Sequence, residues 1–292
     1  MKNVLIAAYL FFTPFFVGAQ GYKLMWEDNF DKSTLDEKYW TIEENDNGGG
    51  NNEMQYYRPE NISIEKLDAV SCLVISAKKE KIGNKFFSSG RLVTRGKVSC
   101  KYGKIEARIK LPSTANGLWP AFWMLGEDYS TVGWPRCGEI DILEMGSGEG
   151  ISQNKQDRFF NGACHWGETW TCNVQNKTAD YSLQNDFHLY TLIWDQDSIK
   201  MYLDLDKYPN TEPYYSMSIV GEDVAGNVSH YFKKPFGLLF NLAVGGSFTG
   251  IMEDANINKI TALPVDGAPI KMYFDYIRIY QKGVAGEEFH CQ

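Results

Sequence analysis

The sequence predicts an all-β fold, a single β-sandwich or jelly roll. Short runs of apolar and β-branched residues recur along the 292-residue chain, each bracketed by turn-forming residues. Long helical periodicity is absent, and neither a Pro/Ser-rich linker nor an internal repeat interrupts the pattern. Many short strands in one uninterrupted stretch indicate one domain, which we place at residues 20–292.

The clearest strand is predicted at residues 104–111, where charged and apolar residues alternate. This alternation is typical of a strand with one buried face. Further strands are expected at residues 73–76, 189–194, 198–203, 236–244 and 271–280. The Asn/Gly-rich residues 45–52 predict a loop at a sheet edge, and no Lys-Ser/Thr pair follows them to bind phosphate.

The first 19 residues predict a signal peptide. Lys2 precedes an apolar run at residues 4–17, and Gly18 and Ala19 follow it. The run has about 14 residues and contains Pro14, whereas a membrane-spanning helix needs roughly 20. We therefore expect an exported protein, periplasmic or extracellular, without a membrane span.

The net charge and the cysteine spacing argue against a nucleic-acid-binding protein and against a structural zinc site. A net charge of −8 argues against nucleic acid as a partner and favours neutral substrates. The six cysteines allow 15 full pairings in an oxidising compartment, among which the sequence does not choose, although Cys164 and Cys172 could close a small loop. The chain has no CxxC pair, so a structural zinc site is not expected. The cysteines are Cys72, Cys100, Cys137, Cys164, Cys172 and Cys291.

Residues 138–144 carry the candidate chemistry. Cleavage of a glycosidic bond needs one carboxylate to attack or stabilise the anomeric carbon and one carboxylic acid to protonate the departing oxygen. Glu139 and Glu144 could form this pair, with Asp141 between them raising the proton affinity of one partner. A solvated acidic strand is the simplest alternative, but the apolar Ile140, Ile142 and Leu143 argue against it. A Ca²⁺ site is less expected, because ligands along a strand do not wrap an ion as a loop does.

Strand geometry adds a condition. In a regular strand Glu139 and Asp141 share one face, whereas Glu144 points to the other, into the core. A buried unpaired glutamate would be costly. We therefore predict a β-bulge between Asp141 and Glu144 that returns all three acids to one face.

Tryptophans are concentrated around this segment. Trp119 and Trp123 fall on one face of a predicted strand, and Trp134 and Trp166 lie nearby in the sequence. Core packing explains any one of them. For the group, we expect a groove in which the rings stack on sugars.

At these residues the chain resembles glycoside hydrolase family 16, and within it the laminarinase-like endo-β-1,3(4)-glucanases. The signature lies at residues 133–144, with further similarity at residues 51–57, 90–92, 102–112, 117–126, 165–166, 241–246 and 275–280. The resemblance implies a curved antiparallel, concanavalin-like jelly roll with substrate lying across its concave sheet. It also implies a retaining double displacement without an organic cofactor. The spacing E-x-D-x-x-E is similar to that of laminarinases, whereas typical bacterial lichenases have E-x-D-x-E.

The resemblance implies a role for each matched residue. Glu139 would be the nucleophile, Asp141 its modulator and Glu144 the general acid and base, with His165 supporting the site. The implied substrate contacts are Asn52, Arg91, Trp119, Trp123, Trp134 and Trp166, with Glu53 and Gln55 as weaker matches.

Many relatives bind calcium on the convex face. Gly103 and Asp275 match two of the usual ligand positions, but Asn29 stands where relatives often have an acid. We expect a weak structural ion or none.

The function that follows is hydrolysis of internal β-1,3 bonds, or of mixed-linkage β-1,3-1,4 glucan, by a monomer. Two alternatives stay open: a galactan hydrolase of the agarase or porphyranase kind, and a β-glucan-binding protein without activity. The three acids argue against the second alternative. The scarcity of clustered cations near the tryptophans argues against a sulfated galactan.

Overall fold

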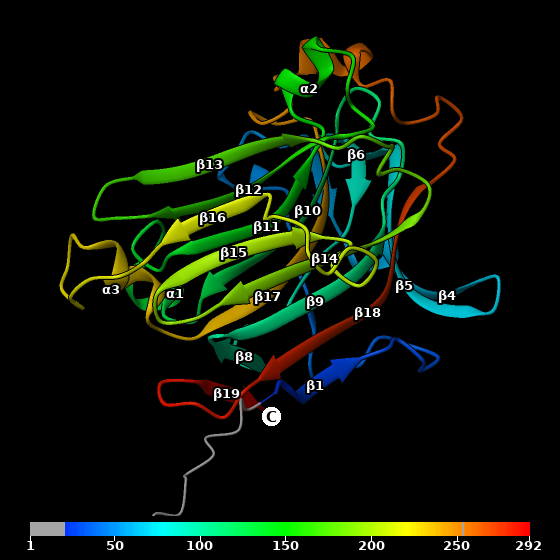
Figure 1. Cartoon of the computed structure of the whole chain (residues 1–292). Coiled ribbons are helices and arrows are strands. Elements are labelled where there is room, and N and C mark those ends of the chain that lie inside the picture. The colour runs from blue at the N-terminus through cyan, green and yellow to red at the C-terminus, as the bar shows by residue number, and fades with distance from the viewer. Residues whose placement is uncertain (1–20, 253) are drawn as a thin grey trace, which may run out of the picture.

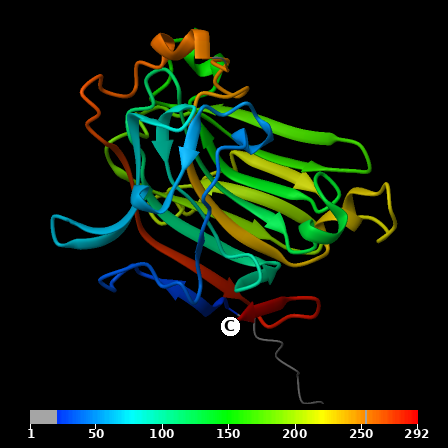
Figure 2. The same ribbon diagram turned by 180° about the vertical axis from the view of Figure 1, so that it is seen from behind.

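The computed structural model describes residues 21–252 and 254–292. The predicted signal peptide at residues 1–19 lies outside them. The described chain folds into two stacked β-sheets, as predicted. Figures 1 and 2 show that the strand axes of the two sheets are roughly aligned. Within the described residues, no helix has the length and apolar character needed to cross a membrane.

The ten-stranded sheet has the order β16-β15-β14-β9-β18-β5-β6-β3, with β1 paired to β18 and β4 to β5. Its strands are β1 (Lys23–Asp28), β3 (Gln55–Tyr57), β4 (Ile62–Leu67), β5 (Val70–Ile82), β6 (Lys85–Ser89), β9 (Gly103–Lys110), β14 (Phe187–Trp194), β15 (Ser198–Leu203), β16 (Tyr215–Ser218) and β18 (Ile270–Gln281). Pairing is antiparallel throughout the described strands of both sheets except between β3 and β6.

The nine-stranded sheet has the order β13-β12-β11-β10-β17-β7-β2, with β8 paired to β17 and β19. Its strands are β2 (Thr41–Ile42), β7 (Arg91–Val93), β8 (Val98–Lys101), β10 (Leu118–Gly126), β11 (Glu139–Met145), β12 (Phe159–Trp166), β13 (Thr171–Thr178), β17 (Phe236–Val244) and β19 (Glu288–Cys291). Short helices complete the chain: α1 (Tyr129–Val132), α2 (Gly148–Ser152), α3 (Val228–Phe232) and the 3₁₀ turns η1 (Gly48–Gly50), η2 (Pro59–Asn61) and η3 (Asp254–Lys259).

The core lies between the sheets. Strands β10 and β17 pair along their whole length at the centre of the nine-stranded sheet and send alternate side chains inward. The ring of Phe240 on β17 packs against Phe274 on β18 of the other sheet, with centroids 4.2 Å apart, and both rings are completely buried. Burying such a ring contributes about 1.5–3 kcal/mol. The opposite side of β10 is thereby left to face outward, and we call this side of the nine-stranded sheet the groove face.

The cysteines correct one expectation. All six are free. Cys164 is completely buried on the core side of β12, whereas Cys172 pairs in register with His165 and is exposed. Because adjacent positions in a strand point to opposite faces, Cys164 and Cys172 lie on opposite sides of the sheet and do not close the suggested loop.

Candidate active site

Strand β11 carries the three predicted catalytic acids, and it contains the predicted bulge. Its pairing with β12 shifts register between Asp141 and Glu144. The two residues in between, Ile142 and Leu143, are both completely buried in the core. A regular strand would point Glu144 inward. The bulge returns it to the same side as Glu139 and Asp141, which confirms the predicted geometry.

The bulge is held by a partner from the other sheet. Ile142 falls at the register shift on both sides and pairs with neither β10 nor β12. The hydroxyl of Tyr214, which precedes β16, donates a hydrogen bond to the carbonyl oxygen of Ile142. A buried carbonyl without a partner would be destabilising. Tyr214 therefore supplies the bond that the sheet ladder lacks here.

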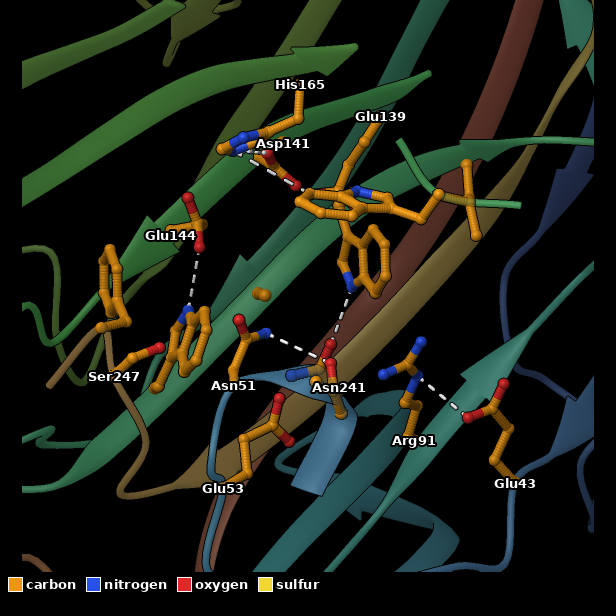
Figure 3. Close-up of a pocket in the computed structure, with 18 of the residues that line it drawn as sticks. Glu43, Asn51, Glu53, Arg91, Glu139, Asp141, Glu144, His165, Asn241 and Ser247 are labelled. Atoms are coloured by element: carbon orange, nitrogen blue, oxygen red, sulfur yellow. Dashed lines mark hydrogen bonds and ion pairs between the residues drawn. The ribbon is translucent and has the colours of Figure 1, made fainter. Parts of the chain in front are cut away.

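The three acids line an open groove of about 770 Å³ on the groove face. Figure 3 shows Glu139, Asp141 and Glu144 projecting into it from one strand. Side chains from strands β7, β10, β12, β13 and β17 complete its floor and walls. A groove that crosses several strands suits an extended polymer better than a compact ligand.

Glu144 is held by two neutral donors. The indole nitrogen of Trp119 donates to Oε1 at 3.1 Å, and the side-chain amide of Asn161 donates to Oε2 at 2.8 Å. Burial raises the pKa of Glu144, while these two hydrogen bonds oppose the rise. A buried carboxyl with a raised pKa is suited to carry a proton to a leaving group.

Glu139 and Asp141 have a different environment. Burial, followed by the negative charge of Asp141, raises the pKa of Glu139 well above its ordinary value. Burial and the charge of Glu144 raise the pKa of Asp141 in the same way. Three acids this close do not all ionise together near neutral pH, so the cluster retains protons for acid catalysis.

His165 lies opposite Glu139 on the neighbouring strand β12. Its Nε2 atom is 3.3 Å from Oδ2 of Asp141 and 4.0 Å from Oε1 of Glu139. Its positive form would lower the pKa of Glu139, against the larger effect of burial. The prediction that His165 supports the site agrees with this placement, which Figure 3 also shows.

Four more predicted contacts line the groove: Arg91, Trp119, Trp123 and Trp134. The guanidinium of Arg91 lies 4.9 Å from the centroid of the Trp123 ring and forms a 3.1 Å ion pair with Glu43. The indole nitrogen of Trp123 donates to Oδ1 of Asn241 at 2.7 Å. Arg91 thus lies over the ring of Trp123 and Asn241 binds its indole nitrogen, which fixes the aromatic surface in the groove.

The Asn/Gly-rich loop forms another wall of the groove. Its Gly48–Gly50 turn has three positive φ angles, which glycine adopts without strain. Asn51 and Glu53 line the groove, whereas Asn52 is exposed and lies outside the lining, so the structure does not place Asn52 with the other predicted contacts. Gln55 is buried beneath the wall and donates to Glu53 at 2.7 Å.

Trp166 is a second correction. It follows His165 directly in β12 and therefore points to the opposite face of the strand. Its ring packs edge-on against Phe232 of α3, with centroids 5.7 Å apart, at the margin of the core. Trp170, in the turn between β12 and β13, lines the groove in its place.

Among the groove residues that were not predicted from the sequence are Asn161, Asn241 and Trp170. Asn161 pairs in register with Glu144, so counting back in steps of two from His165 would have found it. Asn241 lies opposite Ala121 and would follow from the pairing of β10 with β17. Trp170 lies in a turn and has no periodic signal.

The residues that match the family's calcium positions do not fit a strong site. Oδ2 of Asp275 forms a 2.5 Å ion pair with Arg108. Asp28 is the acid next to the mismatched Asn29, and its two carboxylate oxygens accept hydrogen bonds from the backbone N–H of Phe30 and the indole N–H of Trp40, each at 2.9 Å. Both acids are already engaged by protein donors, which leaves little free negative charge for a hard cation.

Comparison with known proteins places this groove in a family. Residues 37–219 match the model of Glycosyl hydrolases family 16. The chain is 32% identical to glucan endo-1,3-beta-glucosidase A1 of Niallia circulans over 92% of its own length, but it spans only 39% of that protein. It is also 32% identical to the beta-glucanase of Rhodothermus marinus, covering 90% of this chain and 86% of the relative.

A solved structure agrees with this assignment. The structure of a family 16 protein of the mixed-linkage glucan locus of Bacteroides ovatus, in complex with a G4G4G3G product, superposes with a TM-score of 0.76. It is 39% identical and covers 88% of this chain and 100% of the other. With the fold, the bulged acid strand and the family match in agreement, the chain belongs to glycosyl hydrolases family 16.

Proposed function

We propose that this protein is a retaining endo-glucanase that hydrolyses internal bonds of β-1,3 and mixed-linkage β-1,3-1,4 glucans. The observation that carries the proposal is the placement of Glu139, Asp141 and Glu144 on one side of β11, inside an open groove. Paired carboxyls on one face are the arrangement that glycoside hydrolysis requires, and the family resemblance implies the retaining, double-displacement form. An open groove suits attack within a chain rather than at its end.

The proposed reaction has two steps. In the first, the carboxylate of Glu139 bonds to the anomeric carbon while the carboxylic acid of Glu144 gives its proton to the departing glycosidic oxygen. In the second, the Glu144 carboxylate takes a proton from water, and the resulting hydroxide displaces Glu139 from the anomeric carbon. Both steps invert the carbon, so the configuration is retained overall.

Asp141 fits the role of modulator. Its charge raises the pKa of Glu139, and it lies between the nucleophile and the acid along the strand. Its Oδ2 atom approaches His165, which gives the charge a partner outside the reacting pair. Asp141 thus adjusts the charge state of the cluster without bonding to substrate.

The comparisons support both glucan linkages. The relatives from Niallia circulans and Rhodothermus marinus are named as a glucan endo-1,3-beta-glucosidase and a beta-glucanase. The Bacteroides ovatus structure contains a mixed-linkage product. Because this last protein has the highest identity of the three, we propose mixed-linkage glucan as a substrate beside laminarin.

A panel of polysaccharides tests the substrate. Wild type should release reducing ends from laminarin and barley glucan, and Glu139→Gln should release almost none. Agarose and porphyran should stay intact. For the sulfated porphyran, one groove cation, Arg91, is already paired with Glu43. Cleavage of the galactans alone would establish the galactan alternative. Binding of glucan without cleavage by wild type would establish the binding-only alternative.

We also propose that the protein is exported as a monomer after removal of residues 1–19. Lys2, the apolar run at residues 4–17, and Gly18 with Ala19 support this proposal. N-terminal sequencing of the protein secreted by an expressing bacterium should begin near Gln20. Retention of the full N-terminus in the cytoplasm would contradict it.

A further inference from the structure

The side chain of His165 lies between two different kinds of partner. On one edge, the indole nitrogen of Trp170 lies 3.1 Å from Nδ1. On the other edge, Nε2 faces Oδ2 of Asp141 at 3.3 Å and Oε1 of Glu139 at 4.0 Å. The Trp170 and His165 rings are nearly parallel, with 11° between their planes.

The chemistry of the indole group decides where the proton of His165 lies. An indole N–H donates and does not accept, so Nδ1 of His165 must accept with its lone pair. A neutral imidazole carries one proton, which is then on Nε2. The hydrogen bond from Trp170 therefore selects the tautomer whose N–H points at the acids.

Within the part of the chain that the structure describes, Asp141 has a buried carboxylate oxygen that lacks a hydrogen-bond donor. Its side chain is 6% exposed, and Oδ2 has no hydrogen-bond partner of ordinary geometry among the described residues. The Nε2–H group of His165 is the donor that faces this atom. In the tautomer protonated on Nδ1, the lone pair of Nε2 would face Asp141 and Glu139. The buried Oδ2 atom of Asp141 would then meet a second acceptor instead of a donor.

We propose that Trp170 is a positioning residue that holds His165 in the tautomer protonated on Nε2, so that this proton supports Asp141 and, across the longer gap, Glu139. The inference rests on the proposed function for its kinetic consequence, since Glu139 is the nucleophile there. As Glu139 loses its charge to the sugar and regains it, the same N–H remains directed at both carboxyls. Trp170 thus acts on the reaction through His165 and not by contact with the reacting atoms.

Several groups besides Trp170 surround the ring of His165. Glu139, Asp141 and Glu144 face it from β11, Cys172 lies opposite it on β13, and the neutral ring of Trp134 lies 6.3 Å from its centroid. A proton on Nδ1 would set its N–H against the N–H of Trp170, so the indole disfavours any form of the ring that is protonated there. The indole also opposes a metal ion at the Glu139, Asp141 and His165 ligand atoms, which lie within 4.8 Å of one another, because an ion would need the Nε2 lone pair.

The local backbone explains how Trp170 reaches this position. Gly167 begins the turn after β12 with a φ of +108°, a conformation that other residues rarely adopt. The turn brings Trp170 back over the end of the strand beside His165. Trp170 is 60% exposed, so its replacement by another aromatic residue leaves the core untouched.

Nitrogen NMR of ¹⁵N-histidine-labelled protein tests the tautomer directly, without substrate. His165 is identified among the four histidines by the signal lost in His165→Gln. In wild type near neutral pH, Nδ1 should be unprotonated and Nε2 protonated. In Trp170→Phe, which keeps a ring but loses the donor, a population protonated on Nδ1 should appear. Trp134→Phe is the matched control, because Trp134 borders the same imidazole without a hydrogen bond to it, and should leave the wild-type pattern unchanged.

Kinetics on laminarin and barley glucan give the second readout. Losing the support of one hydrogen bond in Trp170→Phe should lower kcat roughly five- to tenfold. KM should change by less than about twofold, because the aromatic surface remains. An Nδ1 proton in wild type, or an unchanged tautomer in Trp170→Phe, would overturn the inference. Wild type that has the expected tautomer but cleaves neither glucan would instead refute the proposed function and leave the tautomer assignment in place.

Discussion

Asn161 on strand β12 lies directly opposite Glu144 on β11 and donates its amide N–H to Oε2 at 2.8 Å. This bond stabilises the charged form of Glu144, while burial stabilises the neutral form. The balance between them sets the pH at which the proposed acid loses its proton.

Removing the donor should therefore shift the pH profile. In Asn161→Ala the pKa of Glu144 rises, so the alkaline limb of kcat/KM should move upward by about 0.5–1 pH unit, the equivalent of one hydrogen bond. Trp119→Phe removes the other donor to Glu144 and should shift the same limb in the same direction. Profiles measured on barley glucan check both variants. A shift to lower pH would show that Glu144 is not the proton donor.

Because the pKa of Glu139 is raised, the ionised Glu139 carboxyl is expected to lower the free energy of unfolding. Above the ordinary value of 4.5 and below the raised folded value, the folded protein binds more protons than the unfolded chain, so stability falls as pH rises through this window. Glu139→Gln should raise the free energy of unfolding at neutral pH by about 1–2 kcal/mol. The gain should vanish near pH 4, about where the unfolded carboxyl is also protonated.

Urea unfolding at both pH values checks this prediction. Glu60 provides the control, because its ion pair with Arg58 lowers its pKa to about 2. Glu60→Gln should give no stabilisation at neutral pH. If Glu139→Gln were no more stable than wild type, the proposed desolvation of the nucleophile would be wrong.

The bulge should depend on the hydroxyl of Tyr214. Tyr214→Phe leaves the buried carbonyl of Ile142 without its donor, which should destabilise the protein by about 1–3 kcal/mol. It should also lower kcat, because Glu144 follows the bulge in the same strand. Tyr190 is the matched control: it is completely buried, and its hydroxyl has no partner among the described residues. Thermal unfolding should show Tyr190→Phe to be as stable as wild type or more so, and equal losses in both variants would contradict the account of the bulge.

Two neighbouring glycines separate backbone strain from the shape of the groove. Gly49 and Gly50 have φ angles of +59° and +78°, so alanine at either should cost about 1–2 kcal/mol. Only at Gly49 would the added Cβ meet another group, Oε1 of Glu53 at 2.3 Å. Gly49→Ala should therefore also raise KM for laminarin, by roughly threefold or more, whereas Gly50→Ala should not. Equal KM values in the two variants would exclude Glu53 from substrate binding.

The sequence predicted most of the fold and the centre of the site because strands alternate with a period of two. That rule placed Trp119 and Trp123 on one face of β10. Combined with the cost of a buried charge, it required the bulge before Glu144. The same rule would have rejected Trp166, which follows His165 and must face the other way.

The remaining differences between prediction and structure lie where no period applies. Asn52 and Asn51 are adjacent in a turn with several positive φ angles, and only the folded loop decides which of them faces the groove. Trp170 reaches His165 through a four-residue turn between two strands, and the sequence contains no pattern that links them. The disulfide suggestion failed because spacing alone does not show which face of a strand a cysteine occupies.

Trapping the glycosyl–enzyme tests the central claim most directly. The protein would be incubated with a 2-deoxy-2-fluoro β-glucan oligosaccharide that carries a good leaving group, then digested and sequenced by mass spectrometry. One sugar adduct per chain is expected, on Glu139, and none in Glu139→Gln. An adduct on Asp141 or Glu144, or turnover of glucan with inverted products and no adduct, would contradict the central claim.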